Sequence, residues 1–345
     1  MADDSNRAAS LRALLQARAG LVSSHAGDTD CVRLCGGAAD GLAGLLIDRF
    51  GPLIAAVDYA GAGGLPAQAL LPLVSGVFPR QHIVVRARAG AGGTNAFLTA
   101  AFHPADAGDA DNSANGAGTL VAHERGLTFE IGRDPAHDFG LFLDAAKARA
   151  FVRDSAAGKR VLNLFSYAGA FGIAAAAGGA REITNVDPNR DYLAWSLRNA
   201  RLNGVSMRVL PDTAQAYLAK HLRRVQRDPQ HPTPDLVIVD PPAFGVGRGN
   251  QRVLRLLWPQ LFDSLRAMRP GQLLLMCNDK SFRSRQSFAA LVQDQLGAWY
   301  RFERLGTCLT AGELNAPRLT LAWSPAVADP FYVEPVVLAG TRTRP

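Results

Sequence analysis

The residues with the clearest chemical potential stand in one short run, Asp240-Pro241-Pro242-Ala243-Phe244, directly after the apolar stretch 236–239. Two consecutive prolines fix φ at about −65° and remove two N–H donors, so the loop is stiff and its carbonyls stay free as acceptors. The Asp240 carboxylate adds acceptors, and Phe244 offers a flat surface for base stacking, a contact worth roughly 1–3 kcal/mol. This combination suits the capture of a planar base. An ordinary proline turn above a buried phenylalanine is the alternative interpretation.

Further polar segments follow three other apolar runs. The run from Val161 leads into Ser166-Tyr167-Ala168-Gly169, where small residues permit close backbone approach and a helix N-terminus can meet an anion. The next run ends at Asp187, eighteen residues past Gly169, where a carboxylate can accept hydrogen bonds from both hydroxyls of a ribose. Asp212 ends the third run and would lie beside an adenine. These positions suit an adenosine-containing cofactor, although Asp187 could also simply cap the next helix.

The order of the predicted elements explains how these segments could meet. The alternation of apolar runs and helical patterns predicts βαβ units, right-handed crossovers and a mostly parallel sheet. Ligands bind beyond the carboxyl ends of such strands, where all of these polar segments fall. Two last strands, at 302–310 and 318–323, are joined too closely for a crossover helix and should be antiparallel. Strands are expected near 161–165, 183–187, 207–211, 236–240 and 272–277, and helices at 144–153, 170–178, 191–203, 213–223 and 251–268.

Two cofactors contain adenosine and fit this arrangement, a nicotinamide dinucleotide and S-adenosylmethionine. The spacing Gly-x-Gly-x-x-Gly that is typical of dinucleotide binding is absent from the chain. An antiparallel strand pair at the end of the sheet is also not expected of a dehydrogenase. Both details favour S-adenosylmethionine, with a nicotinamide oxidoreductase kept as an alternative.

The segment 104–118 is small and polar, and it cannot bury enough apolar surface to offset its ordering entropy. We interpret it as a linker between two domains. Residues 1–28 form a helical lead-in, with a helix at 9–19, and residues 29–103 a smaller α/β domain with a hairpin turn at Phe50-Gly51-Pro52. Residues 119–345 form the larger domain, which opens with a hairpin at 120–131. The smaller domain carries no triad, metal cluster or phosphate loop, so packing or substrate positioning is its expected role.

Composition limits the class of protein. The 345 residues carry a net charge of +7, which favours polyanionic partners. No apolar stretch reaches the roughly 18 residues that a membrane span needs, and the acidic start is unlike a signal peptide. Four scattered cysteines do not make a disulfide scaffold or a metal site. We expect a cytoplasmic protein without a membrane anchor and without a bound metal.

Basic residues surround the proline loop in the sequence. If they converge on one edge of the sheet, they would form a rim that binds phosphate groups. Taken singly, each is expected to be a solvated surface residue. The candidates for RNA contacts are Arg248, Arg252, Lys280 and Arg283, and Lys220, Arg223, Arg224 and Arg227 are expected to add positive charge nearby.

Taken together, these motifs resemble the bacterial 23S ribosomal-RNA methyltransferases of the large-subunit methyltransferase I and K type. The resemblance covers nearly the whole chain from about residue 30. It implies a class I methyltransferase fold: a Rossmann-like, mostly parallel seven-stranded sheet with an antiparallel final strand, plus a smaller N-terminal α/β domain. The residues that carry it are 40–51, 137–144, Val161 to Gly169, Val186-Asp187, Leu202-Asn203-Gly204, Asp212, Asp240 to Phe244 and Asn278-Asp279-Lys280.

The resemblance also implies roles for individual residues, with S-adenosylmethionine as cofactor. Asp187 would hold its ribose and Asp212 its adenine, while a flipped base would stack on Phe244 with its edge fixed by Asp240 and the proline carbonyls. Direct in-line transfer would then depend chiefly on positioning. The methionine end would meet the turn around Ala168 and Gly169 together with Asp144, and Phe142, Asn163, Phe165 and Asp240 complete the expected cofactor contacts.

Two departures from the family pattern bear on the substrate. Members of the first type begin with a PUA RNA-binding domain, for which this N-terminus is too short, so RNA recognition would rest on the α/β domain and the basic rim. Enzymes that methylate C5 of cytosine need a thiolate, and their cysteine falls at the position of Asp279. Cys277 lies two residues earlier and is expected to be structural. The stretch Asn278-Asp279-Lys280 resembles the guanine-N7 type.

We therefore predict methylation of a ring or exocyclic nitrogen of an rRNA base. Two alternatives stay open: a methyltransferase for a small molecule or a protein, and a non-catalytic RNA-binding protein that retains the fold. The sequence leaves the target nucleotide undetermined, and either a monomer or a homodimer fits it.

Overall fold

The computed structural model describes residues 2–23, 28–59, 65–87, 96–100, 119–132, 138–242, 252–278, 285–306 and 336–343. Their contacts group the described residues into two compact units that divide between Leu143 and Asp144. The predicted linker at 104–118 lies outside the described residues, so the predicted domain bounds stay a prediction.

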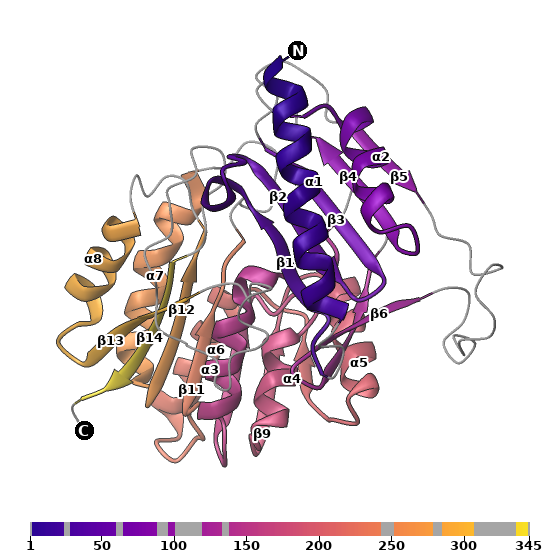
Figure 1. Ribbon diagram of the computed structural model, residues 1–345. Coiled ribbons are helices and arrows are strands. Elements are labelled where there is room, and N and C mark those ends of the chain that lie inside the picture. The colour runs from indigo at the N-terminus through magenta and orange to yellow at the C-terminus, as the bar shows by residue number, and fades with distance from the viewer. Residues whose placement is uncertain are drawn as a thin grey trace. The chain divides into compact units, whose positions relative to one another are not determined.

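The first unit is built on a five-stranded sheet in chain order, β1-β2-β3-β4-β5. Neighbouring strands are antiparallel except β3 and β4, which are parallel and joined through α2. Helices α1 and α2 lie on the same face of this sheet (Figure 1). The elements are α1 (Ala2–Ser23), β1 (Cys31–Gly36), a 3₁₀ turn (Gly37–Asp40), β2 (Leu45–Phe50), β3 (Leu53–Asp58), α2 (Ala67–Val77), β4 (His82–Ala87) and β5 (Ala96–Ala100).

Helix packing closes the core of this unit. Leu11 and Leu15 of α1 and Leu70 of α2 are fully buried, and they meet Ile47 and Ile54 from the sheet. The predicted turn at Phe50-Gly51-Pro52 is confirmed, because Phe50 pairs with Leu53 at the end of the β2–β3 ladder.

The hairpin of β6 (Leu120–Glu124) and β7 (Leu127–Ile131) belongs to the first unit by its contacts. Asp30 fixes it, because its N–H donates to the carbonyl of His123 at 2.8 Å and its carboxylate accepts from the N–H of His123 at 2.5 Å. A Cβ on Gly51 would lie 2.8 Å from the carbonyl oxygen of Val121, so this glycine permits the close approach. The predicted bounds had grouped the hairpin with the larger domain.

The second unit contains the predicted seven-stranded sheet, in the order β10-β9-β8-β11-β12-β14-β13. The ladders from β10 to β12 are parallel, and β14 is antiparallel to both of its neighbours. The mostly parallel sheet with an antiparallel final strand is thereby confirmed. The strands are β8 (Arg160–Leu164), β9 (Glu182–Val186), β10 (Arg208–Leu210), β11 (Leu236–Val239), β12 (Gln272–Cys277), β13 (Tyr300–Leu305) and β14 (Val336–Arg342).

The end of the chain differs from the expected pair of tail strands. β13 confirms a strand near the predicted 302–310, and its described partner is β14. The expected second strand at 318–323 lies outside the described residues. β14 enters between β12 and β13, which places the last strand inside the sheet instead of at its edge.

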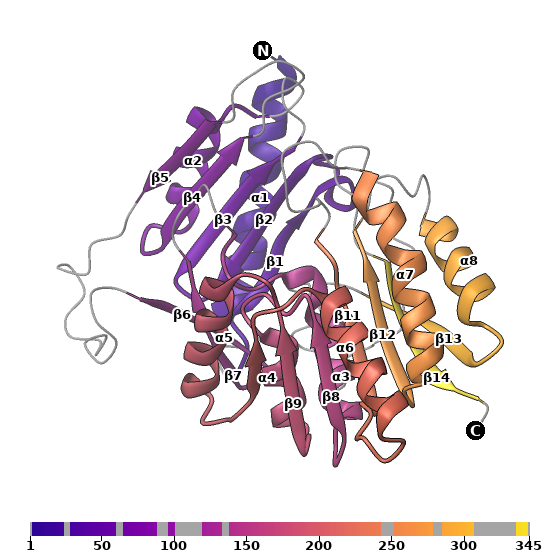
Figure 2. The same cartoon turned by 180° about the vertical axis from the view of Figure 1, so that it is seen from behind.

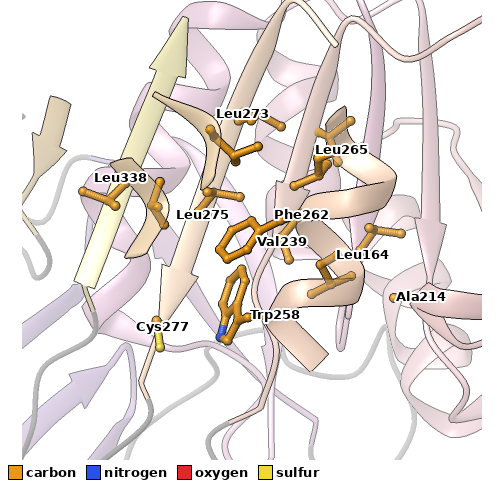
Figure 3. Close-up of a cluster of buried hydrophobic side chains, with 14 of the residues drawn as sticks. Leu164, Ala214, Val239, Trp258, Phe262, Leu265, Leu273, Leu275, Cys277 and Leu338 are labelled. Atoms are coloured by element: carbon orange, nitrogen blue, oxygen red, sulfur yellow. The ribbon is translucent and has the colours of Figure 1, made fainter. Parts of the chain in front are cut away.

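In the described part of the chain, six helices cover the two faces of this sheet. On one face lie α3 (Ala146–Ser155), α4 (Ala170–Ala177) and α5 (Arg190–Leu202), and on the other α6 (Ala214–Arg227), α7 (Arg252–Met268) and α8 (Arg285–Leu296). Figure 2 shows α5 and α8 at opposite ends of the sheet. On the second face, Trp258 and Phe262 of α7 pack against Leu164, Val239 and Leu275 (Figure 3). Burial of such large apolar side chains is the main stabilising contribution to this layer.

The described helices do not include one with the length and apolarity that a bilayer crossing requires. All five parallel strands end at the same edge of the sheet, at Leu164, Val186, Leu210, Val239 and Cys277. The segments that follow these residues form the candidate site.

Candidate functional site

The turn after β8 has an unusual backbone. Phe165 and Tyr167 have φ values of +57° and +47°, which side-chain-bearing residues rarely adopt, and Gly169 has a φ of +81°. Two backbone hydrogen bonds hold the turn: Ser166 N–H donates to the carbonyl of Val186 at 3.1 Å, and Gly169 N–H donates to the carbonyl of Ser166 at 2.8 Å. Strain of this kind persists only where the surroundings enforce it, and it is frequent at functional sites.

Asp187, the residue after β9, enforces this shape. One carboxylate oxygen accepts from the N–H of Tyr167 at 3.0 Å and the other from the N–H of Asn189 at 2.9 Å. The side chain is buried, and this burial raises its pKa, against the opposing effect of the two backbone donors. Because each carboxylate oxygen can accept two hydrogen bonds, Asp187 keeps capacity for a ligand while it fixes the turn. The structure thus brings together Asp187, Ala168 and Gly169, as predicted.

A buried amide network supports the same turn from the side of α5. Asn163 donates to the side-chain oxygen of Asn185 at 3.0 Å, and Asn185 donates to the hydroxyl of Ser196 at 3.0 Å. Asn199 donates to the carbonyl of Ala168 at 2.9 Å. Asn163, Asn185 and Ser196 are fully buried. Sequence reasoning named Asn163 as a cofactor contact; here its amide lies within this network.

Sequence reasoning missed Asn185, Ser196 and Asn199. One signal could have identified them: these polar residues stand at positions that the strand and helix patterns predict to be buried. Two polar atoms near this network, Oδ1 of Asn163 and Oγ of Ser166, are buried and have no hydrogen-bond partner within the described part of the chain. Such atoms are rare in folded proteins and concentrate where a structure is strained or functional.

Asp212 follows β10 and is held in place by two interactions. One carboxylate oxygen accepts from the N–H of Thr213 at 3.0 Å, and the other accepts from Nζ of Lys220 at 2.7 Å. Thr213 caps the N-terminus of α6 through its hydroxyl, which accepts from the N–H of Ala216 at 3.2 Å. Asp212 is therefore oriented at the carboxyl edge of the sheet, two strands away from β8.

Asp240 follows β11, which pairs directly with β8. Burial of its carboxyl group raises its pKa to about 7; the negative charge of Asp144 acts in the same direction, and the positive charge of Arg149 opposes it. Pro241 is buried and Pro242 is exposed. Asp240 thus changes its charge near neutral pH, which an ordinary surface aspartate does not do.

The remaining predicted site residues have varied positions. Phe165 is partly buried and packs against the hydrophobic core cluster on the α6–α8 face. Phe142 lies in the first unit, one residue before the boundary at Leu143, and 44% of its surface is exposed. Arg252 is the first residue of α7. Phe244, Arg248, Lys280 and Arg283 lie outside the described residues.

One part of the predicted basic rim is wrong. α6 begins at the carboxyl edge with Thr213 and runs back along the sheet, so Arg223, Arg224 and Arg227 in its last turns lie toward the amino edge. A helix that follows a parallel strand must return in this way, so these cations do not join the edge that carries the proline loop.

Cys277 ends β12 and belongs to the core cluster that also contains Trp258 (Figure 3). The thiol is reduced and buried, with 5% of the residue exposed. Among the described residues, no group of three or more His, Cys, Asp or Glu side chains is arranged to hold a metal ion.

The close packing at Gly169 predicts a large effect of a single methyl group. In Gly169→Ala the new Cβ would lie 2.1 Å from Oγ of Ser196 at a φ of +81°, so strain and overlap both destabilise the fold. Gly204→Ala is the matched control, because it has a φ of +62° with no neighbour within 4 Å. We expect a loss of about 1 kcal/mol for Gly204→Ala from backbone strain, and about 1–3 kcal/mol more for Gly169→Ala from overpacking, measured by urea unfolding. Equal losses in the two variants would contradict the role of Ser196.

The pKa of Asp240 predicts how stability depends on pH. A carboxyl group whose pKa rises from 3.8 in the unfolded chain to about 7 in the folded protein takes up protons on folding, so its contribution to stability falls as pH rises through this window. Asp240→Asn removes this contribution. We expect the free energy of unfolding of the variant, relative to the wild type, to increase between pH 5 and pH 8 by about 1–3 kcal/mol, because one pKa unit corresponds to about 1.4 kcal/mol. A difference that stays constant with pH would show that Asp240 is ordinarily ionised.

Comparisons with known proteins agree with this geometry. The family described as S-adenosylmethionine-dependent methyltransferase matches residues 79–287. The ribosomal RNA large subunit methyltransferase I of Klebsiella pneumoniae is 28% identical over 284 residues, which are 77% of this chain and 64% of that protein. The ribosomal RNA large subunit methyltransferase K/L of Magnetococcus marinus is 31% identical over 210 residues, which are 58% of this chain and 26% of that protein. The chain thus spans less than two thirds of the length of these curated relatives.

The fold has counterparts among solved structures. The methyltransferase SMU.776, crystallised with SAH, superimposes with a TM-score of 0.71 at 20% identity and covers 97% of this chain and 81% of that one. A methyltransferase from Agrobacterium tumefaciens gives a TM-score of 0.58 at 19% identity over 92% of this chain and 91% of that one. The glycine turn, the acidic strand ends and the match over more than half of the sequence lead to one conclusion: this chain belongs to the S-adenosylmethionine-dependent methyltransferase family.

Proposed function

We propose that the chain is an enzyme that transfers a methyl group from S-adenosylmethionine to a base of large-subunit ribosomal RNA in the cytoplasm. One observation carries this proposal: Asp187 at the end of β9 fixes the strained turn after β8, next to Asp240 at the end of β11. Three neighbouring strand ends thus offer a cofactor region and a base region side by side. The names of the relatives, which act on rRNA, support the choice of substrate.

The residues present fit an adenosyl cofactor. Asp187 has acceptor capacity left on both carboxylate oxygens, which suits the two hydroxyls of a ribose. Asp212 would serve the adenine end. The turn at Ala168 and Gly169, with Asp144, would hold the methionine end, while Asn163 and Phe165 support that turn. When bound, the cofactor supplies a methyl group on a positively charged sulfur.

The loop after β11 would hold the base. Pro241 and Pro242 restrict its backbone, and Phe244 would provide the stacking surface. Because the pKa of Asp240 is about 7, this carboxylate can accept a hydrogen bond or a proton from a base N–H at neutral pH. A nitrogen target therefore suits this loop.

The position of Cys277 also favours a nitrogen target. Methylation at C5 of cytosine needs a thiolate that adds to the ring. The thiol of Cys277 is instead buried in the core cluster that also contains Trp258. Burial of the thiol leaves it inaccessible to a base.

The substrate can be tested directly by mass-spectrometric mapping of rRNA from a strain that lacks the protein. We expect one base modification of large-subunit rRNA to be missing and to be restored by the purified protein with S-adenosylmethionine. Small-subunit rRNA and tRNA are the internal controls. An unchanged modification map, together with methyl transfer to a protein or a metabolite, would refute the rRNA substrate.

The division between the cofactor and base regions predicts different effects of two substitutions. Asp187→Ala removes the carboxylate that fixes the turn, so we expect at least a tenfold loss of affinity for S-adenosylhomocysteine in calorimetry. Phe244→Ala removes only the stacking surface, so cofactor affinity should stay within about twofold while transfer slows by roughly 10–100-fold, equivalent to 1–3 kcal/mol of stacking. Melting curves of both variants control for unfolding. Full cofactor affinity in folded Asp187→Ala would contradict the assignment.

A further inference from the structure

The positive charge of the chain is concentrated in one short segment. Residues 190–227 contain eight lysines and arginines and two aspartates, a net charge of +6, whereas the whole chain carries +7. The other 307 residues are therefore close to neutral. The segment comprises α5, β10 and α6, three consecutive elements of the second unit.

These three elements surround an open edge of the sheet. β10 is the outermost strand, next to β9, and α5 and α6 flank it on the two faces. We call the surface of this segment the basic flank. Its exposed cations are Arg190, Arg198 and Arg201 of α5, Arg208 of β10, and Lys220, Arg223, Arg224 and Arg227 of α6.

The acids of the segment do little to neutralise the flank. Asp212 is already engaged by Lys220 at 2.7 Å, which leaves Asp191 against seven arginines. Elsewhere in the second unit, Arg160 and Arg181 form ion pairs with Glu182 and Asp235. The arrangement of charge on the flank thus differs from the mixed charges of the neighbouring surface.

Two structural explanations account for part of this charge. Cations in the last turn of a helix interact favourably with its dipole, which suits Arg201 of α5 and Arg224 and Arg227 of α6. A cation on an edge strand discourages pairing with another sheet, which suits Arg208. Neither effect explains Arg190 and Arg223. Neither effect requires that a segment of 38 residues contain only two acids.

The flank is connected to the candidate site through aromatic side chains. Tyr192 and Trp195 of α5 pack against Tyr167 of the strained turn, with ring centroids 4.6 and 5.9 Å apart. From this cluster the cations extend along α5, where Arg190 and Arg201 are about 16 Å apart at 1.5 Å per residue. Arginines beside aromatic rings are typical of surfaces that bind single-stranded RNA.

We propose that the basic flank binds the phosphate backbone of the RNA substrate and anchors it while the target base occupies the site at the carboxyl edge. This inference rests on the proposed function. Arginine suits the role because its guanidinium matches phosphate oxygens and stays charged at all physiological pH values. The flank includes the cations in the last turns of α6, which were expected at the proline loop and instead lie along this side of the sheet. It binds phosphates without reading sequence.

The test compares the two edge strands of the sheet. Arg208→Glu changes an exposed residue of β10 on the flank, and Arg301→Glu changes an exposed residue of β13, at the opposite edge, where Glu303 balances the charge. A second pair on the flank, Arg223→Gln with Arg227→Gln, removes two cations without introducing acids. Melting temperature and calorimetry with S-adenosylhomocysteine establish that each variant is folded and binds cofactor.

Binding is measured with large-subunit rRNA from the deletion strain and with a single-stranded RNA of unrelated sequence, at several salt concentrations. Each lost phosphate contact should reduce the slope of log K against log salt by about 0.7–0.9. We expect Arg208→Glu and the double variant to bind both RNAs at least fivefold more weakly. The KM for rRNA should rise while kcat at saturating RNA stays unchanged. Arg301→Glu should match the wild type, and Arg208→Lys should restore most of the affinity.

Outcomes separate the two proposals. If wild type and flank variants bind both RNAs equally, with the same salt slope, the flank is not the anchor, whether or not rRNA is methylated. If the flank variants lose affinity for both RNAs but no rRNA base is methylated by the wild type, the proposed reaction fails and the RNA surface stands. If Arg301→Glu weakens RNA binding as much as Arg208→Glu does, the change in net charge alone explains the loss. The assignment of the basic flank as the RNA anchor is then wrong.

Discussion

The candidate site depends on the hydrogen bond between the Asp187 carboxylate and the N–H of Tyr167. The turn after β8 holds two non-glycine residues at positive φ, each of which costs on the order of 1–3 kcal/mol. A single carboxylate cannot impose such a shape by itself. Asp187 acts together with the carbonyl of Val186 from the same strand end, so β9 fixes the turn through both its backbone and its side chain.

The amide network completes this constraint from the opposite side. Buried amides are unfavourable unless they are hydrogen-bonded, and Asn185 meets this condition by accepting from Asn163 and donating to Ser196. The same amide lies where a Cβ on Gly172 would be, 2.6 Å from its oxygen, so the first turn of α4 can approach β9 only with glycine at this position. A polar network that excludes other shapes holds the turn in advance of any ligand, which reduces the ordering cost of binding.

The sequence was informative where a local pattern determines the structure. The apolar runs around Val161 and Leu236 predicted parallel strands, and parallel strands alone bring Asp187 and Asp240 to one edge. The amide network could not be predicted from the sequence, because only the fold shows that Asn185 and Asn199 stand on buried faces of their elements. Strand pairing over a long separation was equally hidden: no local signal indicates that β14 enters the sheet between β12 and β13. The cations of α6 were misplaced because charge was counted along the chain without regard to the direction of the helix.

The distribution of charge answers a difficulty that any such enzyme meets. A positively charged cofactor favours acids at the site, whereas RNA is repelled by them. Two of the acids at this site present little negative charge to an RNA. Asp212 is paired with Lys220, and Asp240 has a pKa of about 7 and is only partly ionised at neutral pH. The arginines toward the amino edge lie more than ten residues along α6 from the site, about 16 Å, which exceeds the screening length of roughly 8 Å at physiological salt. Acids and cations can therefore act on their own ligands with little mutual cancellation. Attraction of a polyanion and retention of a cation become compatible because the arginines at the end of α6 lie away from the carboxyl edge that holds the acids.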